Sequence, residues 1–361
     1  MRILIVTQTF PPRLGGMQSV MSSLALKFSK RYSTIVFPDH FLPQDHYLRN
    51  SSIQYNFTNY PKIIRSLIKK NKINEILKND DVIICDSWKS LKAIPKNNNK
   101  VIMLAHGQEL LSKSNQKKFI KLVGKVTNII PNSNFTKDLI VNISYSLKSK
   151  IKIIPPTYEI SDDKFNIKKN RTINKKIHLI TISRLEERKG FVPLIKALKI
   201  LLDNEKINCF EWSIYGKGEF KKDIENSIID NQLTKFVKLK GFINDKKKHD
   251  VLMNSDLFLM PSYQVNNSIE GFGISYIEAA KYGIPSISGI EGGVKDAVIN
   301  KKSGWNVNPL DEKKLVKVLF TAITNHTLRK RFGENARKLF VEEFASEKVF
   351  GKLMGIVKSS F

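Results

Sequence analysis

The sequence S-I-E-G-F-G-I-S-Y-I-E-A, residues 268–279, is the stretch around which the second half of this chain is organised. It follows an apolar run ending at Met260, which predicts a buried strand, and it leads into a helix expected over residues 275–282. Gly271 and Gly273 carry no Cβ, so the backbone here can pass close to a ligand. The helix start offers N–H groups and the positive end of the helix dipole. The stretch therefore predicts a strand, a glycine loop and a helix suited to holding a phosphate group.

Two carboxylates, Glu270 and Glu278, lie on either side of this glycine pair. Glu270 is expected in the loop, beside whatever group the phosphate carries, and Glu278 one turn into the helix. A carboxylate in that position can accept hydrogen bonds from the two adjacent hydroxyls of a ribose. The same residues also permit a purely structural interpretation. In it, Ser275 and Glu278 form a capping box for the helix, and Glu270 is a loop carboxylate facing water.

The length and composition favour two domains of similar size. The chain has 361 residues and is 41% hydrophobic, and both halves alternate short apolar strands with helical patterns. We therefore predict an α/β protein of two Rossmann-like domains. The first covers residues 1–158 and the second residues 177–345. Between them the charged run over residues 159–176 is expected to be a linker, and a final helix over residues 346–361 is expected to pack back on the first domain.

The apolar runs predict the positions of the individual elements. Strands are expected at residues 2–7, 33–37, 53–57, 82–85, 101–104, 128–130, 151–154, 177–183, 210–215, 237–239, 257–260 and 285–288. Helices are expected near residues 17–30, 61–78, 191–202, 220–231, 246–255, 275–282 and 312–324. In open parallel sheets ligands bind at the carboxyl ends of strands, so the residues that follow each strand are the candidates for function.

Several classes of protein are disfavoured by the composition. Cys85 and Cys209 lie in apolar runs far apart, which predicts no disulfide framework and suits a reducing cytoplasm. The six histidines show no metal-binding spacing. The N-terminal residues predict a first strand and no signal peptide, and no apolar run approaches the roughly 20 residues needed to span a bilayer. We expect a cytoplasmic protein without a bound metal.

The net charge of +28 is concentrated in the first half, where residues 1–158 carry +17. Such a surface suits an anionic membrane or nucleic acid, although a lysine-rich composition alone explains part of it. Residues 61–78 form an amphipathic pattern whose cations include Arg65, Lys69, Lys70 and Lys72. We expect peripheral binding to an anionic membrane through this helix and no binding of nucleic acid. Alternatively, the helix packs its apolar face on the sheet and leaves its lysines in water.

Four more places at strand ends carry candidate residues. Gly15 and Gly16 follow the first strand, without a Gly-x-Gly-x-x-Gly or Walker-type loop, and His106 follows the strand at 101–104. In the second half, Arg184 and Lys189 in S-R-L-E-E-R-K-G can flank a diphosphate. Gly216 in Y-G-K-G follows the next strand and suits close approach by a flat base. Each place also has a structural alternative. Gly15 and Gly16 could only make a sharp strand-to-helix turn, and His106 could be a structural histidine. Arg184 and Lys189 could belong to an ordinary charged loop, and Gly216 to a tight turn.

With these residues assembled, the chain resembles the retaining family-4 glycosyltransferases, which have the GT-B fold of two Rossmann-like domains facing a central cleft. The resemblance covers nearly the whole chain. It rests on five motifs in order, which are F-P-P-R-x-G-G, A-H-G-Q-E, S-R-L-x-x-R-K-G, Y-G-K-G-E and the glutamate pair at 270 and 278. G-G-M-Q-S and G-G-V-K-D-A-V are most similar to bacterial GDP-mannose-dependent mannosyltransferases of the phosphatidylinositol mannoside type. The loop M-P-S-Y-Q-V-N-N-S departs from that branch, where it is typically more basic.

The resemblance implies roles for the candidate residues of the second half. Arg184 and Lys189 would hold the donor diphosphate, and Glu270 would contact the transferred sugar. Glu278 would bind the ribose of the nucleotide. Gly273 and Ile274 would supply backbone N–H groups to phosphate. The family needs no metal, which agrees with the lack of an Asp-x-Asp sequence at these positions.

From the first half, the resemblance implies that Gly16 contacts the diphosphate through its N–H and that His106 lies near the sugar. The implied reaction is transfer of a hexose, with mannose favoured, from a GDP- or UDP-linked donor to a lipid-linked or saccharide acceptor, with retention. Such enzymes serve synthesis of cell-envelope polysaccharide, lipopolysaccharide or glycolipid. The alternatives are a sugar-nucleotide epimerase or a phosphorylase on the same fold, or a family member without activity.

Overall fold

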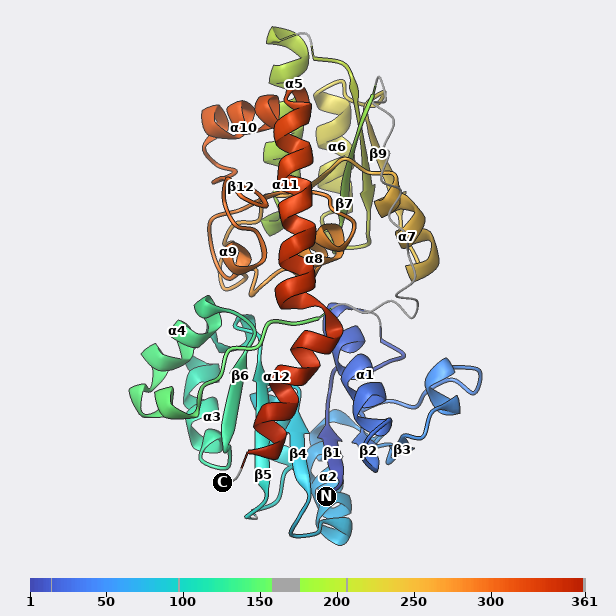
Figure 1. Cartoon of the computed structure of the whole chain (residues 1–361), viewed down its shortest axis with the longest axis vertical. Coiled ribbons are helices and arrows are strands. Elements are labelled where there is room, and N and C mark those ends of the chain that lie inside the picture. The colour runs from blue at the N-terminus through green and yellow to red at the C-terminus, as the bar shows by residue number, and fades with distance from the viewer. Residues whose placement is uncertain (14, 97, 158–175, 206, 360–361) are drawn as a thin grey trace. The chain divides into compact units, whose positions relative to one another are not determined.

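The computed structural model describes residues 1–13, 15–96, 98–157, 176–205 and 207–359. These residues form two compact units (Figure 1). The N-terminal unit consists of residues 1–159 together with 345–361, and the C-terminal unit consists of residues 160–344. Nearly all of the predicted linker, residues 159–176, lies outside the described residues.

The N-terminal unit is built on a six-stranded parallel sheet in the order β3-β2-β1-β4-β5-β6. Its strands are β1 (Ile3–Val6), β2 (Thr34–Phe37), β3 (Gln54–Tyr55), β4 (Val82–Cys85), β5 (Lys100–Ala105) and β6 (Asn128–Pro131). Every residue of β1, β2, β4 and β5 is buried, as expected of parallel strands that are covered on both faces. Ile3 pairs with Thr34 on one side and with Val82 on the other.

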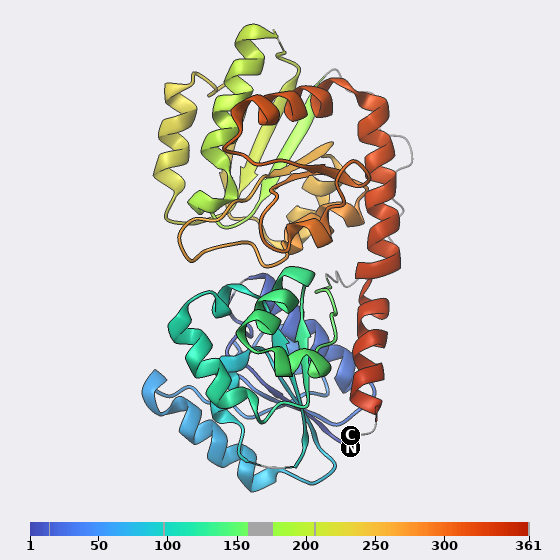
Figure 2. The ribbon, with the colours of Figure 1, turned by 90° about the vertical axis from the view of Figure 1, so that its left-hand side faces the viewer.

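Helices cover both faces of this sheet (Figure 2). On one face lie α2 (Lys62–Ile76) and α3 (Lys113–Val123), which contribute Ile73 and Phe119 to the core. On the other lie α1 (Gly16–Ser29) and the last helix, α12 (Ser346–Lys358), whose Phe28 and Phe350 rings meet edge to face at 4.9 Å. Helix α4 (Asn134–Ile143) follows β6. An ion pair of 2.5 Å between Lys27 and Glu347 also holds α12 to α1.

The C-terminal unit repeats the same architecture. Its parallel sheet has the order β12-β11-β10-β7-β8-β9, with strands β7 (Ile177–Ile182), β8 (Phe210–Tyr215), β9 (Val237–Gly241), β10 (Leu257–Met260), β11 (Ser286–Ser288) and β12 (Gly304–Asn306). Its helices are α5 (Phe191–Asn204), α6 (Lys221–Asp230), α7 (Asp245–Met253), α8 (Ile274–Lys281), α9 (Val294–Ala297), α10 (Glu312–Thr324) and α11 (His326–Leu339).

Counted from its own first strand, each sheet has the Rossmann order 3-2-1-4-5-6. The predicted fold class, an α/β protein of two Rossmann-like domains, is confirmed. The strand order reverses between β1 and β4 in the first sheet and between β7 and β10 in the second. Loops at such a reversal diverge and leave a crevice at the carboxyl ends of the strands, so these two places are where a site is expected.

Two strand predictions were wrong. Residues 151–154 form no named strand, because only an isolated bridge joins Ile151 to Ile129 and two prolines follow directly. Strand β12 was missed, because its three residues include a single large apolar side chain, Trp305, and a periodicity cannot be recognised over so short a length.

Three basic residues of α2 form hydrogen bonds inside the N-terminal unit. Lys69 is buried, and its Nζ donates to Oδ1 of Asp39 at 2.7 Å. Arg65 donates to the other oxygen of Asp39 at 2.8 Å, and Lys72 donates to a backbone carbonyl at 3.0 Å. Lys69 lies one turn before the core residue Ile73 and so faces inward. The expectation that Lys69 faces a membrane or water is therefore wrong, whereas Arg65 and Lys72 are half-buried.

Only some of the apolar residues of α2 pack on the sheet, in contrast to the alternative in which the whole apolar face does so. The second half of the helix packs on the sheet through Ile73. The first two turns instead point outward, with Ile63 93% exposed and Leu67 59% exposed. Ile64 and Tyr60 are exposed beside them. The start of the helix, together with Tyr60 just before it, therefore presents an apolar surface that the sheet does not cover; it is formed by Tyr60, Ile63, Ile64 and Leu67.

Candidate active site

The strand-order reversal of the C-terminal unit brings together three charged side chains. Because β7 and β10 are neighbours, the loops that follow them begin side by side. The first loop contains the 3-10 turn η5 (Glu187–Lys189), and the second contains Glu270. Nη1 of Arg188 donates to Oε2 of Glu270 at 2.9 Å, and Nζ of Lys189 donates to the same oxygen. All three side chains are largely buried, so this is an ion-paired cluster within the unit.

Glu270 is ionised at neutral pH. Burial alone would raise its pKa, but the ammonium of Lys189 and the guanidinium of Arg188 outweigh burial and lower the pKa to about 2. For Lys189 burial is the larger influence, and the pKa of its ammonium is lowered from the ordinary value despite Glu270. The site therefore contains a carboxylate that can only accept hydrogen bonds, next to two cations held in fixed positions.

The two residues predicted to clamp a diphosphate have different surroundings. Lys189 is 8% exposed and engaged with Glu270, whereas Arg184 is 67% exposed and pairs with Glu186 at 2.6 Å. Arg188, which the sequence prediction did not single out, is buried and pairs with Glu270 instead. A usable signal was Gly190, which has a φ of +80° and whose Cβ would lie 2.5 Å from the carbonyl oxygen of Pro261. Because Gly190 has no Cβ, the turn that carries Arg188 and Lys189 can pack directly against the loop after β10.

Helix α8 begins next to this cluster with an uncapped N-terminus. Its N-cap is Gly273, which has a φ of +93°, and Ile274 is the first helical residue. A Cβ on Gly273 would lie 2.4 Å from the ring of Tyr276, so glycine is required here. The Tyr276 hydroxyl donates to the carbonyl of Met260 at 2.5 Å and fixes the helix to the end of β10. Within the described residues no side chain caps this N-terminus, which leaves it suited to an anion.

Glu278 does not form the capping box that was the structural alternative. Ser275 is the second helical residue and not the N-cap, and Oε1 of Glu278 accepts from Nζ of Lys248 at 3.1 Å. Lys248 lies on α7 and also contacts Asp245. Glu278 is buried on α8 beside this lysine. The sequence prediction missed Lys248, because nothing in the run D-K-K-K-H indicates which lysine faces inward.

Gly216 is required for packing within the chain. A Cβ at this position would lie 1.9 Å from the carbonyl oxygen of Ser183, and one on Gly218 would lie 2.1 Å from that of Leu185. The loop after β8 therefore packs against the loop after β7. The close approach of these two loops depends on the glycines at positions 216 and 218.

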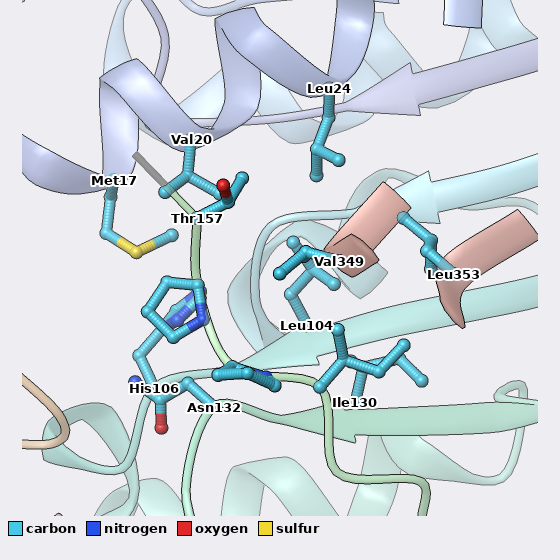
Figure 3. A pocket seen from close by; sticks show the side chains of 13 residues that line it. Met17, Val20, Leu24, Leu104, His106, Ile130, Asn132, Thr157, Val349 and Leu353 are labelled. Atoms are coloured by element: carbon cyan, nitrogen blue, oxygen red, sulfur yellow. The ribbon is translucent and has the colours of Figure 1, made fainter. Parts of the chain in front are cut away.

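In the N-terminal unit, Gly15 and Gly16 are exposed at the start of α1, where Gly15 is the N-cap and Gly16 is the first helical residue. His106 follows β5, and its Nε2 lies 2.7 Å from the carbonyl oxygen of Asp86. Its backbone N–H donates to Glu109 at 2.8 Å. His106 also lines an apolar pocket with Met17 and other side chains of the same unit (Figure 3). The sequence prediction did not single out Asp86.

Among the described residues, no three His, Cys, Asp or Glu side chains gather in a way that could hold a metal ion. The charges of the C-terminal cluster come from Arg188, Lys189 and the N-terminus of α8. Together they can stabilise negative charge on a phosphate, while Glu270 and Glu278 can accept hydrogen bonds from hydroxyl groups.

Comparisons with known proteins agree with this interpretation of the fold. HepE from Anabaena, solved in complex with UDP and glucose, superposes with a TM-score of 0.81 at 19% identity, over 100% of both chains. The two Rossmann-like units thus have the arrangement of strands found in GT-B glycosyltransferase structures.

Sequence relatives were also found. The amylovoran biosynthesis glycosyltransferase AmsK of Erwinia amylovora is 30% identical over 161 residues, which cover 44% of this chain and 39% of AmsK. A GDP-mannose-dependent monoacylated alpha-(1-6)-phosphatidylinositol monomannoside mannosyltransferase of Corynebacterium glutamicum is 23% identical over 99% of this chain and 98% of that protein. The chain thus spans less than half of the length of AmsK and nearly all of the mannosyltransferase.

The family model described as "Glycosyl transferases group 1" matches residues 162–339. The match includes Lys189, Glu270 and Glu278 and covers nearly all of the C-terminal unit. Over residues 162–339 this chain is thus similar to the group 1 glycosyl transferases.

Proposed function

We propose that this protein is a retaining, metal-independent glycosyltransferase. It transfers a hexose, with mannose favoured, from a nucleotide-sugar donor to a lipid-linked or saccharide acceptor in the synthesis of a cell-envelope polysaccharide or glycolipid. The observation that carries the proposal is the Lys189–Glu270–Arg188 cluster at the reversal of strand order, beside the uncapped N-terminus of α8. The names of the relatives support it, since they include glycosyltransferases of polysaccharide and mannoside synthesis.

The C-terminal unit holds the donor. The diphosphate binds at the N–H groups of Gly273 and Ile274, and Lys189 supports it, because an ammonium has three donors and can keep Glu270 as a partner. Arg184 reaches the diphosphate from the exposed end of its loop. Glu278 accepts hydrogen bonds from the ribose, and Glu270 accepts from hydroxyls of the sugar. Gly15, Gly16 and His106 contribute substrate contacts from the N-terminal unit.

The reaction breaks the bond between the anomeric carbon and the phosphate oxygen and forms a bond from that carbon to the acceptor oxygen. The acceptor hydroxyl gives its proton to the departing phosphate on the same face, which retains the configuration. Glu270 is committed to Lys189 and Arg188, which disfavours it as a covalent nucleophile. The cations and the N-terminus of α8 stabilise the negative charge that develops on the leaving diphosphate.

Nucleotide binding tests the proposal directly. UDP or GDP is expected to raise the melting temperature of the whole chain, because a ligand at 100 times its dissociation constant stabilises the native state by about 2.7 kcal/mol. The guanine and uracil forms are both included, since relatives are named for GDP-mannose and for a complex with UDP. A panel of their sugar conjugates then identifies the donor. Absence of stabilisation by every nucleotide and conjugate would contradict the proposal.

The acceptor side of the proposal includes an anionic membrane surface on the inner face of the cytoplasmic membrane. In the part of the chain that the structure describes, none of the helices has both the length and the apolar character needed to span a bilayer. The surface proposed to contact lipid is formed by the uncovered apolar turns of α2. The charge of +17 on residues 1–158 attracts anionic lipid to the same unit.

Removing the exposed apolar side chains of α2 is expected to abolish most membrane binding. The wild type should sediment with phosphatidylglycerol vesicles, weakly with phosphatidylcholine vesicles, and less as salt is added. A double change of Ile63→Ser and Leu67→Ser should weaken binding at least about tenfold, because each such side chain contributes about 1.5 kcal/mol or more when it is buried. The matched control is Ile229→Ser with Leu310→Ser, which are similarly exposed residues of the C-terminal unit. Equal binding by both double variants would rule out α2 as the membrane surface.

A further inference from the structure

A buried carboxylate, Asp86, lies where the strand order of the N-terminal sheet reverses. It follows β4 and is bound by residues of its own turn and by residues that follow the neighbouring strand β1. The side chain is almost completely buried. Its Oδ2 atom accepts from Thr7 Oγ1 at 2.9 Å, Gln8 N at 2.8 Å, Thr9 N at 2.8 Å and Thr9 Oγ1 at 2.6 Å. Its Oδ1 atom accepts from Ser90 Oγ at 2.5 Å and Ser87 Oγ at 3.4 Å.

These hydrogen bonds connect two segments that carry candidate site residues. Residues 7–9 begin the loop that leads to Gly15 and Gly16, and Ser87 and Ser90 belong to the turn after β4. A buried carboxylate is stable only when its oxygens are satisfied, and here donors from both segments satisfy them. Asp86 thus holds the loop after β1 and the turn after β4 as one body.

The backbone carbonyl of Asp86 also determines which ring nitrogen of His106 carries the hydrogen. Nε2 of His106 lies 2.7 Å from that oxygen. Because a carbonyl oxygen can only accept, Nε2 must carry a hydrogen, and the neutral ring then has its lone pair on Nδ1. His106 lines the pocket shown in Figure 3. In this tautomer the ring offers an acceptor to a hydroxyl group and not a donor.

We propose that Asp86 is a positioning residue, whose carboxylate fixes the turn after β4 so that its carbonyl holds His106 in the Nε2–H tautomer, with Nδ1 as the acceptor for a substrate hydroxyl. The part that concerns substrate rests on the proposed function. The part that concerns the tautomer does not, since it follows from the hydrogen bond to Asp86 alone. A carboxylate with a purely structural role would stabilise the fold without determining where His106 carries its proton.

The tautomer of His106 can be measured on the full chain labelled with 15N-histidine, because long-range proton–nitrogen NMR distinguishes a protonated ring nitrogen from an unprotonated one. The chain has six histidines, and the signals of His106 are those lost in His106→Asn. In the wild type, the neutral ring of His106 is expected to show a protonated Nε2 and an unprotonated Nδ1. A neutral ring with the proton on Nδ1 would overturn the proposal, whatever the variants do.

Two substitutions of Asp86 then test the positioning role. Asp86→Ala leaves the N–H groups of Gln8 and Thr9 without their acceptor, so the His106 signals are expected to move toward a mixture of tautomers. The turnover number should fall on the order of tenfold or more, because small displacements of a substrate contact are costly. Asp86→Asn keeps one acceptor oxygen for these N–H groups and can donate to Ser90. It is therefore expected to retain the wild-type tautomer and most of the turnover.

Asp81→Ala is the matched control, because Asp81 is a buried aspartate just before the same strand. It is bound by Arg2 Nε at 2.9 Å and by the N–H of Lys78 at 2.8 Å. This variant is expected to lose stability but to keep the tautomer and the turnover of the wild type below its melting temperature. An unchanged tautomer in folded Asp86→Ala would contradict the proposal. If no transfer is detected in any variant while the tautomers behave as expected, the proposed function fails and the positioning of His106 stands.

Discussion

Replacing Glu270 by glutamine is expected to lower turnover by about 10²–10³-fold, the scale of losing a pre-organised charged group in an active site. The same change should destabilise the C-terminal unit by about 3–5 kcal/mol, because it leaves Lys189 buried beside Arg188 without the carboxylate that neutralises them. Steady-state transfer and thermal unfolding measure the two effects.

A second substitution separates the two effects. Lys189→Met removes the cation that Glu270→Gln leaves unpaired, so the double variant should recover much of the lost stability. Arg188 keeps a partner in Glu186 at 2.9 Å. Turnover should not recover, because both groups that contact the donor are absent. Recovery of turnover together with stability would show that the cluster only holds the fold together.

The cluster also gives the unit a defined dependence on acid. The pKa of Glu270 is about 2 in the folded protein, below its ordinary value of 4.5. A carboxyl group whose pKa is lowered on folding stabilises the protein above its unfolded pKa and loses that contribution as pH falls. About 3 kcal/mol should therefore be lost between pH 4.5 and pH 2 in the wild type. In Glu270→Gln this part of the acid dependence should be absent.

Replacing Glu278 by glutamine is expected to weaken nucleotide binding by about 10–100-fold, since hydrogen bonds to a charged group contribute about 1.5–3 kcal/mol. The fold should tolerate the change, because Glu278 caps no helix and Lys248 keeps its contact with Asp245 at 3.1 Å. Isothermal titration of UDP or GDP, whichever binds, into both proteins measures the loss.

The role of Glu278 is tested most sharply by also changing the ligand. If the carboxylate binds the ribose, a 2′,3′-dideoxy nucleotide should bind the wild type more weakly by a similar factor. In Glu278→Gln the same nucleotide should show little further loss, because the interacting partner is already gone. Equal and additive losses in the two proteins would mean that Glu278 acts through Lys248 alone and does not contact the ribose.

Sequence alone determined the sheets and the positions of most strands. The predicted bounds of Val82–Cys85, Phe210–Tyr215 and Leu257–Met260 agree with β4, β8 and β10, and Glu312–Thr324 agrees with α10. Central parallel strands are buried on both faces and therefore read as short continuous apolar runs, which are visible without any knowledge of partners. The loop–glycine–helix order around Gly273 was recognisable for the same local reason, and the helix starts only one residue earlier than expected.

The tertiary structure alone decided which charged residues meet. Glu270 pairs with Arg188 and Lys189, and not with Arg184, because a 3-10 turn after β7 directs residues 188 and 189 inward. Glu278 pairs with Lys248 of another helix. In the N-terminal unit, Asp86 after β4 binds the segment that follows β1. These partners are 30 to 82 positions apart in the sequence. Local periodicity specifies strands and helices, whereas ion pairs of this kind depend on which strands become neighbours, and only the folded sheet sets that order.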